Sequence, residues 1–219
     1  MLASERPFCD DGDPTTINDI IREDGCTCRG EPITDLNFRT KIMLEGPFNS
    51  ASGFMRDGLR KEGLLPYADP FNLGITATVG LFDVQGQNAI VDWVLVELRD
   101  KDSVENIIDS RPMLLQRDGD IVMPNGSIQL IFEGIEEGVF FVSIRHQNHL
   151  SLTTEAAISI NANTVIDFSN PFTPVFGDSQ SSKILNGKRL MLAGDANGDG
   201  TINAADKNLY WKRENGSQT

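Results

Sequence analysis

The segment Ala89–Arg99 constrains the fold more than any other part of the chain. It reads Ala-Ile-Val-Asp-Trp-Val-Leu-Val-Glu-Leu-Arg, an almost unbroken apolar run rich in β-branched residues. A strand with one wet face alternates apolar and polar residues, whereas a strand buried on both faces reads as a continuous apolar run. We therefore expect residues 89–99 to form a central strand that is covered from both sides.

Shorter strand signals flank this segment. They lie within residues 37–46 (around 41–45) and at residues 113–116, 121–123, 128–132, 139–146 and 165–168. Asp118-Gly119 between the second and third of these predicts a hairpin turn. Gly and Asp mark the other connections, and helical periodicity is almost absent before the C-terminal segment. The pattern predicts a mainly β protein, a Greek-key β-sandwich of the Ig-like or prealbumin-like kind.

We divide the 219 residues into three parts. Residues 1–37 form an acidic, turn-rich segment that carries the cysteines, and residues 38–170 form the sandwich. Residues 171–219 begin as a linker rich in Pro, Ser and Asn and continue into a calcium loop with a short helix. The chain begins without the basic and apolar stretches of a secretory signal peptide, as if cut from a longer protein.

Residues 195–206 read Asp-Ala-Asn-Gly-Asp-Gly-Thr-Ile-Asn-Ala-Ala-Asp and match a twelve-residue, EF-hand-like calcium loop. Ca²⁺ is a hard cation that takes about six to eight oxygen ligands, and a glycine at loop position 6 permits the sharp turn around it. Gly200 occupies that position. The predicted ligands are the side chains at positions 1, 3, 5, 9 and 12 and the backbone carbonyl at position 7: Asp195, Asn197, Asp199, Asn203, Asp206 and Thr201.

This loop has an exiting helix but no entering one. The helix is expected from Ala204 to before Gly216, and Tyr210 and Trp211 are expected to pack it onto the sandwich. Position 12 is Asp206 rather than the bidentate Glu of sensor loops. These features resemble the dockerin type of calcium repeat. The alternative is a metal-free surface turn rich in Asp, Asn and Gly.

All three cysteines lie in the first 30 residues, at Cys9, Cys26 and Cys28. Cys26 and Cys28 are too close to pair comfortably, so we expect Cys9 to form a disulfide with one of them. A zinc site lacks a fourth ligand nearby, since His146 and His149 are far along the chain. A disulfide favours an extracellular or cell-surface location.

The acidic turn beside Cys9 offers a second group of calcium-type ligands. The candidates are Asp10, Asp11 and Asp13 with Asn18 or Asp19. Their spacing fits no calcium-loop template, so a solvated acidic turn is the favoured interpretation.

The charge of the chain restricts its partners. With 19 basic and 32 acidic residues the formal net charge is −13, and no basic stripe is visible. Nucleic acid and anionic lipid are therefore not expected partners. No run approaches the ~20 apolar residues of a membrane-spanning helix, so we expect no membrane insertion.

No arrangement in the sequence predicts an enzyme. His146 and His149, three apart on an expected strand, would face opposite sides and could not share a metal without a bulge. His146 is expected to point inward and His149 to cap the strand end. The strand carboxylates Asp92, Glu97, Asp118 and Asp120 could pair as a glycosidase acid and base, which is a remote alternative.

Aromatic residues open a second alternative, a carbohydrate-binding module. Tyr67, Tyr210 and Trp211 could stack on sugar rings. Trp93 could do the same, but its place in an apolar run predicts a core residue.

Three blocks of sequence resemble the C-terminal region of large secreted and cell-surface proteins of Bacteroidota. They are residues 41–48 with 63–66, residues 90–100 with 114–120, and residues 142–150 with 193–200. The cysteine-bearing segment 9–28 is similar to a short repeat found upstream in such proteins. The resemblance implies a secreted or cell-surface multidomain protein, of a kind that often carries adhesin-like or polysaccharide-associated modules.

The expected function is therefore that of a Ca²⁺-stabilised structural or adhesive module, which could also form fibres. Its partner would be a polysaccharide, another surface protein or further copies of itself. Such proteins commonly carry a second calcium repeat, whereas one loop occurs here, which favours a structural clamp over a dockerin pair that grips a partner.

Overall fold

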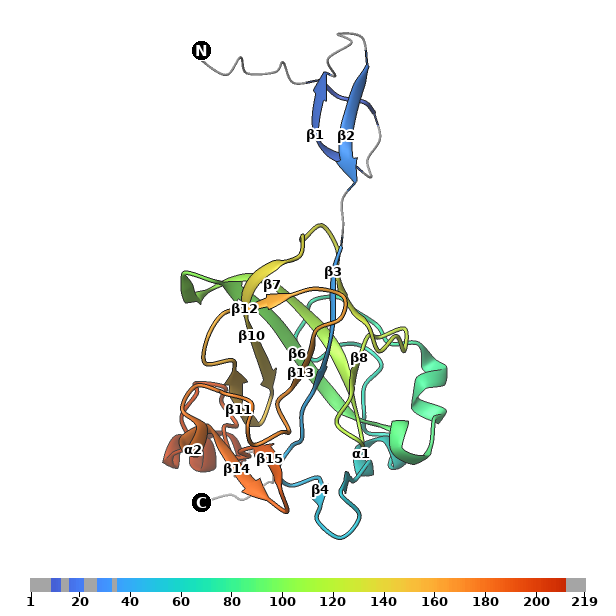
Figure 1. Ribbon diagram of the computed structural model, residues 1–219. Helices are drawn as coiled ribbons and strands as arrows, with labels where there is room; N and C mark the ends of the chain where they lie inside the picture. The colour runs from blue at the N-terminus through green and yellow to red at the C-terminus, as the bar shows by residue number, and fades with distance from the viewer. Residues whose placement is uncertain (1–8, 13–15, 22–26, 33–34, 212–219) are drawn as a thin grey trace.

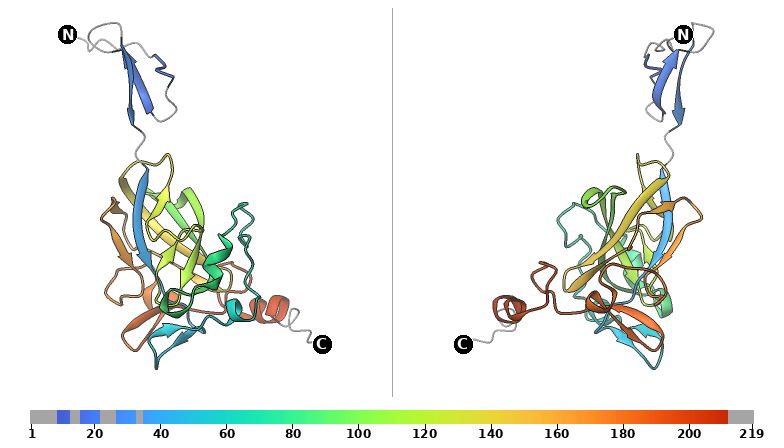
Figure 2. Two further views of the ribbon diagram at one scale, coloured as in Figure 1. Left: turned by 90° about the vertical axis from the view of Figure 1, so that its right-hand side faces the viewer. Right: turned by 60° about the vertical axis from the view of Figure 1, so that its left-hand side comes forward.

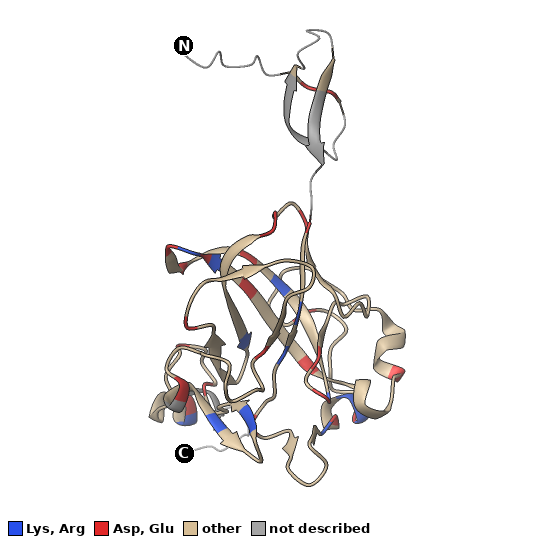
Figure 3. Ribbon diagram, in the orientation of Figure 1, with Lys and Arg blue, Asp and Glu red and all other residues tan. Residues whose placement is uncertain are grey.

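The computed structural model describes residues 9–12, 16–21, 27–32 and 35–211. The protein is mainly β, with 43% strand and 11% helix, and its several sheets are consistent with a β-sandwich (Figure 1). None of the helices in these ranges has the length and apolar composition needed to cross a bilayer. Lys and Arg are interspersed with Asp and Glu over the body (Figure 3).

The larger sheet is antiparallel and is built around β6 (Ile90–Asp100). The strand order is β11-β10-β6-β7-β8, and β12 also pairs with β10. The other bounds are β7 (Ser103–Gln116), β8 (Ile121–Val122), β10 (Gly138–His146), β11 (His149–Thr153) and β12 (Ile158–Ile160). The predicted central strand is confirmed, as is the hairpin at Asp118-Gly119, where Leu114 pairs with Val122.

The smaller sheet has the order β13-β3-β9. β3 (Leu36–Lys41) runs parallel to β13 (Val165–Asp167) and antiparallel to β9 (Leu130–Phe132). Phe38 of β3 stacks on Phe132 of β9 with ring centroids 5.7 Å apart. The main core cluster joins these strands to the inner face of the larger sheet through Val94, Val96 and Ile144.

The outer face of the larger sheet is covered by the long connection between β3 and β6. This connection contains β4 (Phe48–Asn49), β5 (Phe54–Met55), α1 (Gly58–Lys61), η1 (Val79–Asp83) and η2 (Gly86–Asn88). Leu65, Ala77 and Phe82 from it form a second core cluster with Trp93. Trp93 is 1% exposed, and its Nε1 donates to the carbonyl of Pro66 at 2.8 Å. The expectation that Trp93 is a core residue is confirmed.

One strand boundary was predicted wrongly. We expected a strand within residues 37–46, around residues 41–45, whereas β3 (Leu36–Lys41) covers only the first part of that range. Ile42, Met43 and Leu44 are buried outside a strand, and Ile42 N donates to the carbonyl of Gly119 at 2.8 Å. The apolar run therefore reflects core burial, with pairing limited to an isolated bridge between Leu44 and Met191.

The N-terminal segment contains more regular structure than the expected acidic turn. β1 (Thr16–Ile21) and β2 (Cys28–Pro32) form an antiparallel hairpin that stands apart from the body (Figures 1 and 2). Cys9 and Cys28 form a disulfide across a Cα–Cα distance of 6.0 Å. Cys26 lies outside the described residues.

We expected the part of the chain from residue 171 to begin as a linker. Residues 171–194 instead belong to the body. They form α2 (Asp178–Ser181) and the hairpin of β14 (Ser182–Leu185) and β15 (Lys188–Met191). Met191 is fully buried and bridges Leu44 in parallel. Arg189, 1% exposed, donates to the carbonyls of Asn170, Pro171 and Thr173 and so holds the preceding loop.

Candidate functional site

The predicted calcium loop follows β15 directly and is attached to the turn between β10 and β11. Gly194 N donates to the carbonyl of Asn148 at 2.8 Å, and Ala193 forms an isolated bridge with His149. Ala193 N also donates to Oε2 of Glu45 at 3.2 Å. The start of the loop is thus fixed to the body by backbone bonds. The helical turn η3 (Asp206–Trp211) follows the loop at the edge of the body (Figure 2).

Asp195 organises the first half of the loop. Its Oδ1 accepts the N–H of Asp199 at 3.1 Å, and its Oδ2 accepts the N–H of Gly200 at 3.0 Å. Gly200 has φ +81°, a left-handed conformation that costs glycine little. The first and fifth positions are thereby drawn around one turn, as the loop template requires.

Asp206 closes the loop from its other end. Its Oδ1 accepts the N–H groups of Ala196 and Asn197 at 2.9 and 3.2 Å. Its Oδ2 accepts the N–H of Asn203 at 2.8 Å, while Oδ1 of Asn203 accepts the N–H of Ala205 at 2.7 Å. Asn203 thus acts as an N-cap through the N–H of Ala205, and the return bond from Asp206 makes the pair similar to a capping box at the start of the exiting helix. One carboxylate therefore joins the two ends of the loop and also caps η3.

The charge state of Asp206 follows from these bonds. The N–H of Asn203 contributes most to lowering the pKa of Asp206, and those of Asn197 and Ala196 add to it against the opposing effect of burial. Backbone donors favour the ionised form of a carboxyl. The side chain is therefore a carboxylate at neutral pH.

The six predicted calcium ligands differ in exposure. Asp195 and Asp206 are each 3% exposed, whereas Asp199, Thr201 and Asn203 are exposed and Asn197 is half-buried. Asn197 and Asp199 are joined by a hydrogen bond of 2.6 Å. Within the described ranges, no three His, Cys, Asp or Glu side chains by themselves form a metal-binding group. The candidate set instead mixes three aspartates with two asparagines and a carbonyl.

Two features of the loop bear on whether it could hold a hard cation. Each ionised carboxylate has about four acceptor positions, of which hydrogen bonds use two in Asp195 and three in Asp206. Among the described residues, neither carboxylate forms an ion pair with Lys, Arg or His. Backbone N–H groups already stabilise both carboxylates, and a bound divalent cation would add the opposite charge that neither has as a side-chain partner.

The second candidate calcium group, at the N-terminus, is only partly described. Oδ1 of Asp10 accepts the N–H of Gly12 at 2.8 Å, which forms a local turn. Asp13 lies outside the described residues, and nothing is described for the side chains of Asn18 and Asp19.

The two histidines depart from the expected geometry. His146 ends β10 and His149 begins β11, and a two-residue turn makes them cross-strand partners instead of residues on opposite faces of one strand. Their Nδ1 atoms lie 2.9 Å apart, and both side chains are buried. Nε2 of His146 lies 3.2 Å from Oδ2 of Asp92, and Nε2 of His149 lies 3.0 Å from the carbonyl of Glu45. The inward position of His146 is as expected, but the strand-end role of His149 was wrong.

Burial and the neighbouring His146 lower the pKa of His149 to about 4. The pair therefore ties β10 and β11 to β6 and to the chain after β3. Its contacts are internal to the body.

The strand carboxylates are engaged with separate partners. Glu97 is 1% exposed and bonds Arg99 and Arg145. Asp120 pairs with Lys41 at 3.0 Å, and Asp118 accepts the N–H of Asp120 at 3.2 Å.

The aromatic candidates for sugar stacking are also accounted for where they are described. Tyr67 is 46% exposed and meets Phe82 edge-on at 4.7 Å. Trp93 is buried and offers no ring face to a ligand. The side chains of Tyr210 and Trp211 lie outside the described part of the structure.

Comparison of the chain with known protein families, with curated proteins and with solved structures found no match.

Proposed function

We propose that the protein is a non-catalytic extracellular module whose C-terminal loop, residues 195–206, is held closed by Ca²⁺. The observation that carries the proposal is the pair of buried carboxylates, Asp195 and Asp206, at the two ends of the loop. Asp195 organises the first half of the loop, Asp206 joins its two ends, and neither has a cationic side chain as partner among the described residues. When bound, the ion would supply the positive charge that these groups lack.

The ligands of the ion would come from both halves of the loop. Asp195, Asn197 and Asp199 would contribute from the first half, and Asn203, Asp206 and the Thr201 carbonyl from the second. Six oxygens match the lower end of the coordination number that Ca²⁺ adopts. The mixture of carboxylate and amide oxygens also suits calcium better than a transition metal, which favours imidazole or thiolate.

The attachment of the loop supports a constitutive clamp over a switch. Gly194 and Ala193 are fixed to the β10–β11 turn and to Glu45, so the entry of the loop cannot swing as an entering helix does. An affinity of about 10⁻⁴–10⁻³ M, typical of extracellular modules, would keep such a loop filled outside the cell. We assign the module a Greek-key β-sandwich fold and a structural or adhesive role in a secreted or surface protein.

Calcium-dependent thermal melting tests the proposal. We expect Ca²⁺ to raise the melting temperature of the full chain in a saturable way, and Asp195→Asn and Asp199→Asn to weaken the response. Asp102→Asn is the matched control, because Asp102 is 78% exposed and lies in the β6–β7 turn. An identical melting temperature in millimolar Ca²⁺ and in excess chelator would contradict the proposal.

A further inference from the structure

A β-bulge near the start of β6 gives Asp92 an unusual direction. The pairing with β7 shifts register between Ile90 and Asp92. Ile90 and Trp93 belong to the outer core cluster, and Val91 and Val94 belong to the inner one. Residues three apart face opposite sides of a regular strand, so the bulge has inserted one residue into the alternation. Asp92 lies at this register shift, between residues that face opposite sides of the sheet.

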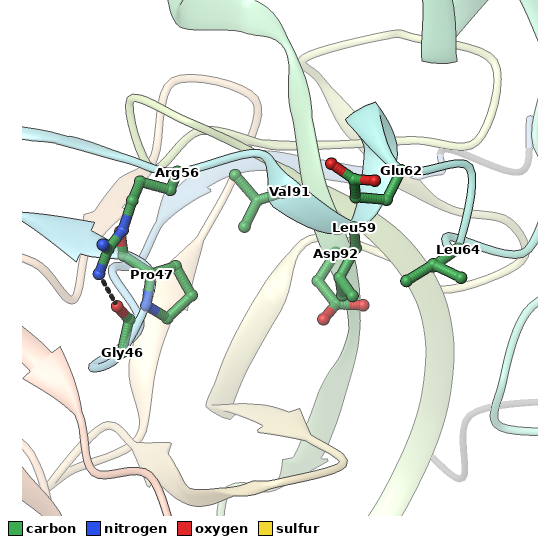
Figure 4. Close-up of a pocket in the computed structure, with 9 residues that line it drawn as sticks. Gly46, Pro47, Arg56, Leu59, Glu62, Leu64, Val91 and Asp92 are labelled. Atoms are coloured by element: carbon green, nitrogen blue, oxygen red, sulfur yellow. Dashed lines mark hydrogen bonds between the residues drawn. The ribbon is translucent and has the colours of Figure 1, made fainter.

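The bulge places Asp92 in the wall of a cavity of about 390 Å³. The cavity lies between β6, α1 and the bend before β4, and Figure 4 shows Arg56 with Gly46 on one side and Leu59, Glu62 and Leu64 on the other. Its size falls within the usual range of ligand pockets, about 300–1,000 Å³. A bulge that turns a polar side chain into a cavity is a feature often found beside binding sites.

The walls of this cavity are mainly apolar and partly open to water. Pro47 and Val91 lie in them, and Leu59 and Leu64 are 43% and 69% exposed. An aliphatic group that entered the cavity would cover these leucines and remove apolar surface from water, which is favourable.

The charged groups of the cavity leave an excess of negative charge. Nη2 of Arg56 donates to the Gly46 carbonyl at 2.8 Å and its Nε to the Pro47 carbonyl at 3.4 Å, so its donors are directed at backbone. Oδ1 of Asp92 accepts the N–H of Trp93 at 2.8 Å, and Oδ2 contacts His146. A carboxylate has about four acceptor positions, so Asp92 keeps capacity for another donor. Glu62 at the rim is exposed.

We propose that this cavity binds a lysine side chain presented by a partner polypeptide. The aliphatic stem would lie against Leu59 and Leu64, and the ammonium would be shared by Asp92 and Glu62. A compact ammonium suits Asp92 better than a guanidinium. The planar guanidinium of arginine binds a carboxylate through both oxygens, and each oxygen of Asp92 already has one partner. The net charge of −13 favours the approach of a cationic partner.

The pocket shares no residue with the calcium loop. The binding is therefore expected to persist in excess chelator, so that failure of the calcium clamp and failure of the lysine pocket can be told apart.

Methyl NMR titration of the full chain with short peptides tests the proposal. The probes are acetyl-Ala-Lys-Ala-amide, the same peptide with norleucine in place of lysine, and n-butylamine. We expect saturable shifts of the Leu59, Leu64 and Val91 methyl groups with the lysine peptide, and at least tenfold weaker binding of the norleucine peptide. We expect n-butylamine to bind several-fold more weakly than the lysine peptide.

Variants at the pocket separate charge from shape. Asp92→Asn is expected to weaken lysine binding at least tenfold. Since this change also alters the partner of His146, Glu62→Gln and Leu64→Ala at exposed positions provide a second test, each with a several-fold loss. Glu133→Gln, an exposed carboxylate beyond β9, is the matched control and should bind as the wild type does.

Three results would overturn the proposal. They are the absence of saturable shifts with the lysine peptide, equal affinity for the norleucine peptide, and equal affinity for n-butylamine. The last would assign the pocket to a small amine and not to a polypeptide side chain.

Discussion

The β-sheet body, called the sandwich below, and the proposed calcium loop are stabilised by different forces. Two apolar clusters on the two faces of the larger sheet hold the sandwich, and most of their members are under 5% exposed. In the loop, Ile202 is 44% exposed and the order comes from carboxylates that accept backbone N–H groups. Apolar burial acts without any ion, whereas buried carboxylates depend on what balances their charge. Stability of the two regions should therefore respond to different perturbations.

The largest effect is expected in the core of the sandwich. Trp93→Ala removes the largest fully buried side chain and leaves a cavity, which should cost about 4 kcal/mol of unfolding free energy. Urea denaturation with and without Ca²⁺ measures it, and the cost should be the same in both. Leu73→Ala, at a residue 49% exposed, is the control. A loss below about 1 kcal/mol for Trp93→Ala would show that this cluster does not determine stability.

A slightly smaller effect is expected from the buried arginine. Arg189→Met keeps the volume but removes the donors to the carbonyls of Asn170, Pro171 and Thr173, at a cost of about 3 kcal/mol. Lys188→Met on the same strand is the matched control, because within the described part of the chain its Nζ forms one hydrogen bond, a long one of 3.4 Å to Oγ of Ser169. Equal stability of the two variants would rule out a clamp role for Arg189.

Acid should weaken the body through His149. Its folded pKa of about 4 lies below the ordinary 6.5, so the unfolded chain binds more protons between these values. The unfolding free energy is therefore unaffected by protonation of His149 above pH 6.5. It falls as the pH decreases toward 4, by about 3 kcal/mol in total. Chemical denaturation across this range measures it. His149→Gln should flatten the slope, and an unchanged slope would assign the acid sensitivity to other groups.

Calcium removal should have a moderate effect. With Ca²⁺ about tenfold above its dissociation constant, binding stabilises the folded chain by about 1.4 kcal/mol. Calorimetry before and after addition of chelator gives the value, and hydrogen exchange locates it. The protection lost should be confined to residues 195–206 and η3. Equal loss across β6 and β10 would contradict the separation of the two regions.

The smallest effect is expected at the exposed ion pair of Lys101 and Asp102 in the β6–β7 turn. Asp102→Asn should change the unfolding free energy by less than about 0.5 kcal/mol, since exposed pairs are screened by water. Thermal melting at low and high salt measures this. A change above about 1 kcal/mol would indicate that surface charge contributes to the sandwich as well.

The sequence predicted the parts of the fold that depend on local pattern. The continuous apolar run gave β6 as a central strand, and Asp118-Gly119 gave the β7–β8 hairpin. It did not predict what covers β6, because Leu65 and Phe82 lie in a connection without strand or helix periodicity. The β14–β15 hairpin was also missed. Its sequence is largely polar, and nothing in it indicates that one of these polar residues, Arg189, is buried.

The candidate sites were predictable to different degrees. The spacing of Asp195 and Asp206 predicted a closed loop, and both carboxylates do bond the loop backbone, while the calcium ion itself stays a prediction. The cavity beside Asp92 was not predicted. It is formed by a register shift in β6 together with residues from α1 and the bend before β4, which are far apart in the sequence. The only available signal was one acidic residue inside an apolar run. The histidine pair was missed for a similar reason, a two-residue turn inside an expected strand.

The position of β3 has a mechanical consequence. β3 lies between β13 and β9 and is the strand that leads from the separate β1–β2 hairpin into the body (Figure 1). A pulling force that enters through the hairpin would act along the axis of β3, across the direction of its hydrogen bonds to both neighbours. Those bonds would be loaded in shear and would have to break together instead of opening one by one. Resistance to force would then depend on the rate of unfolding, and β3 would be the element that sets it.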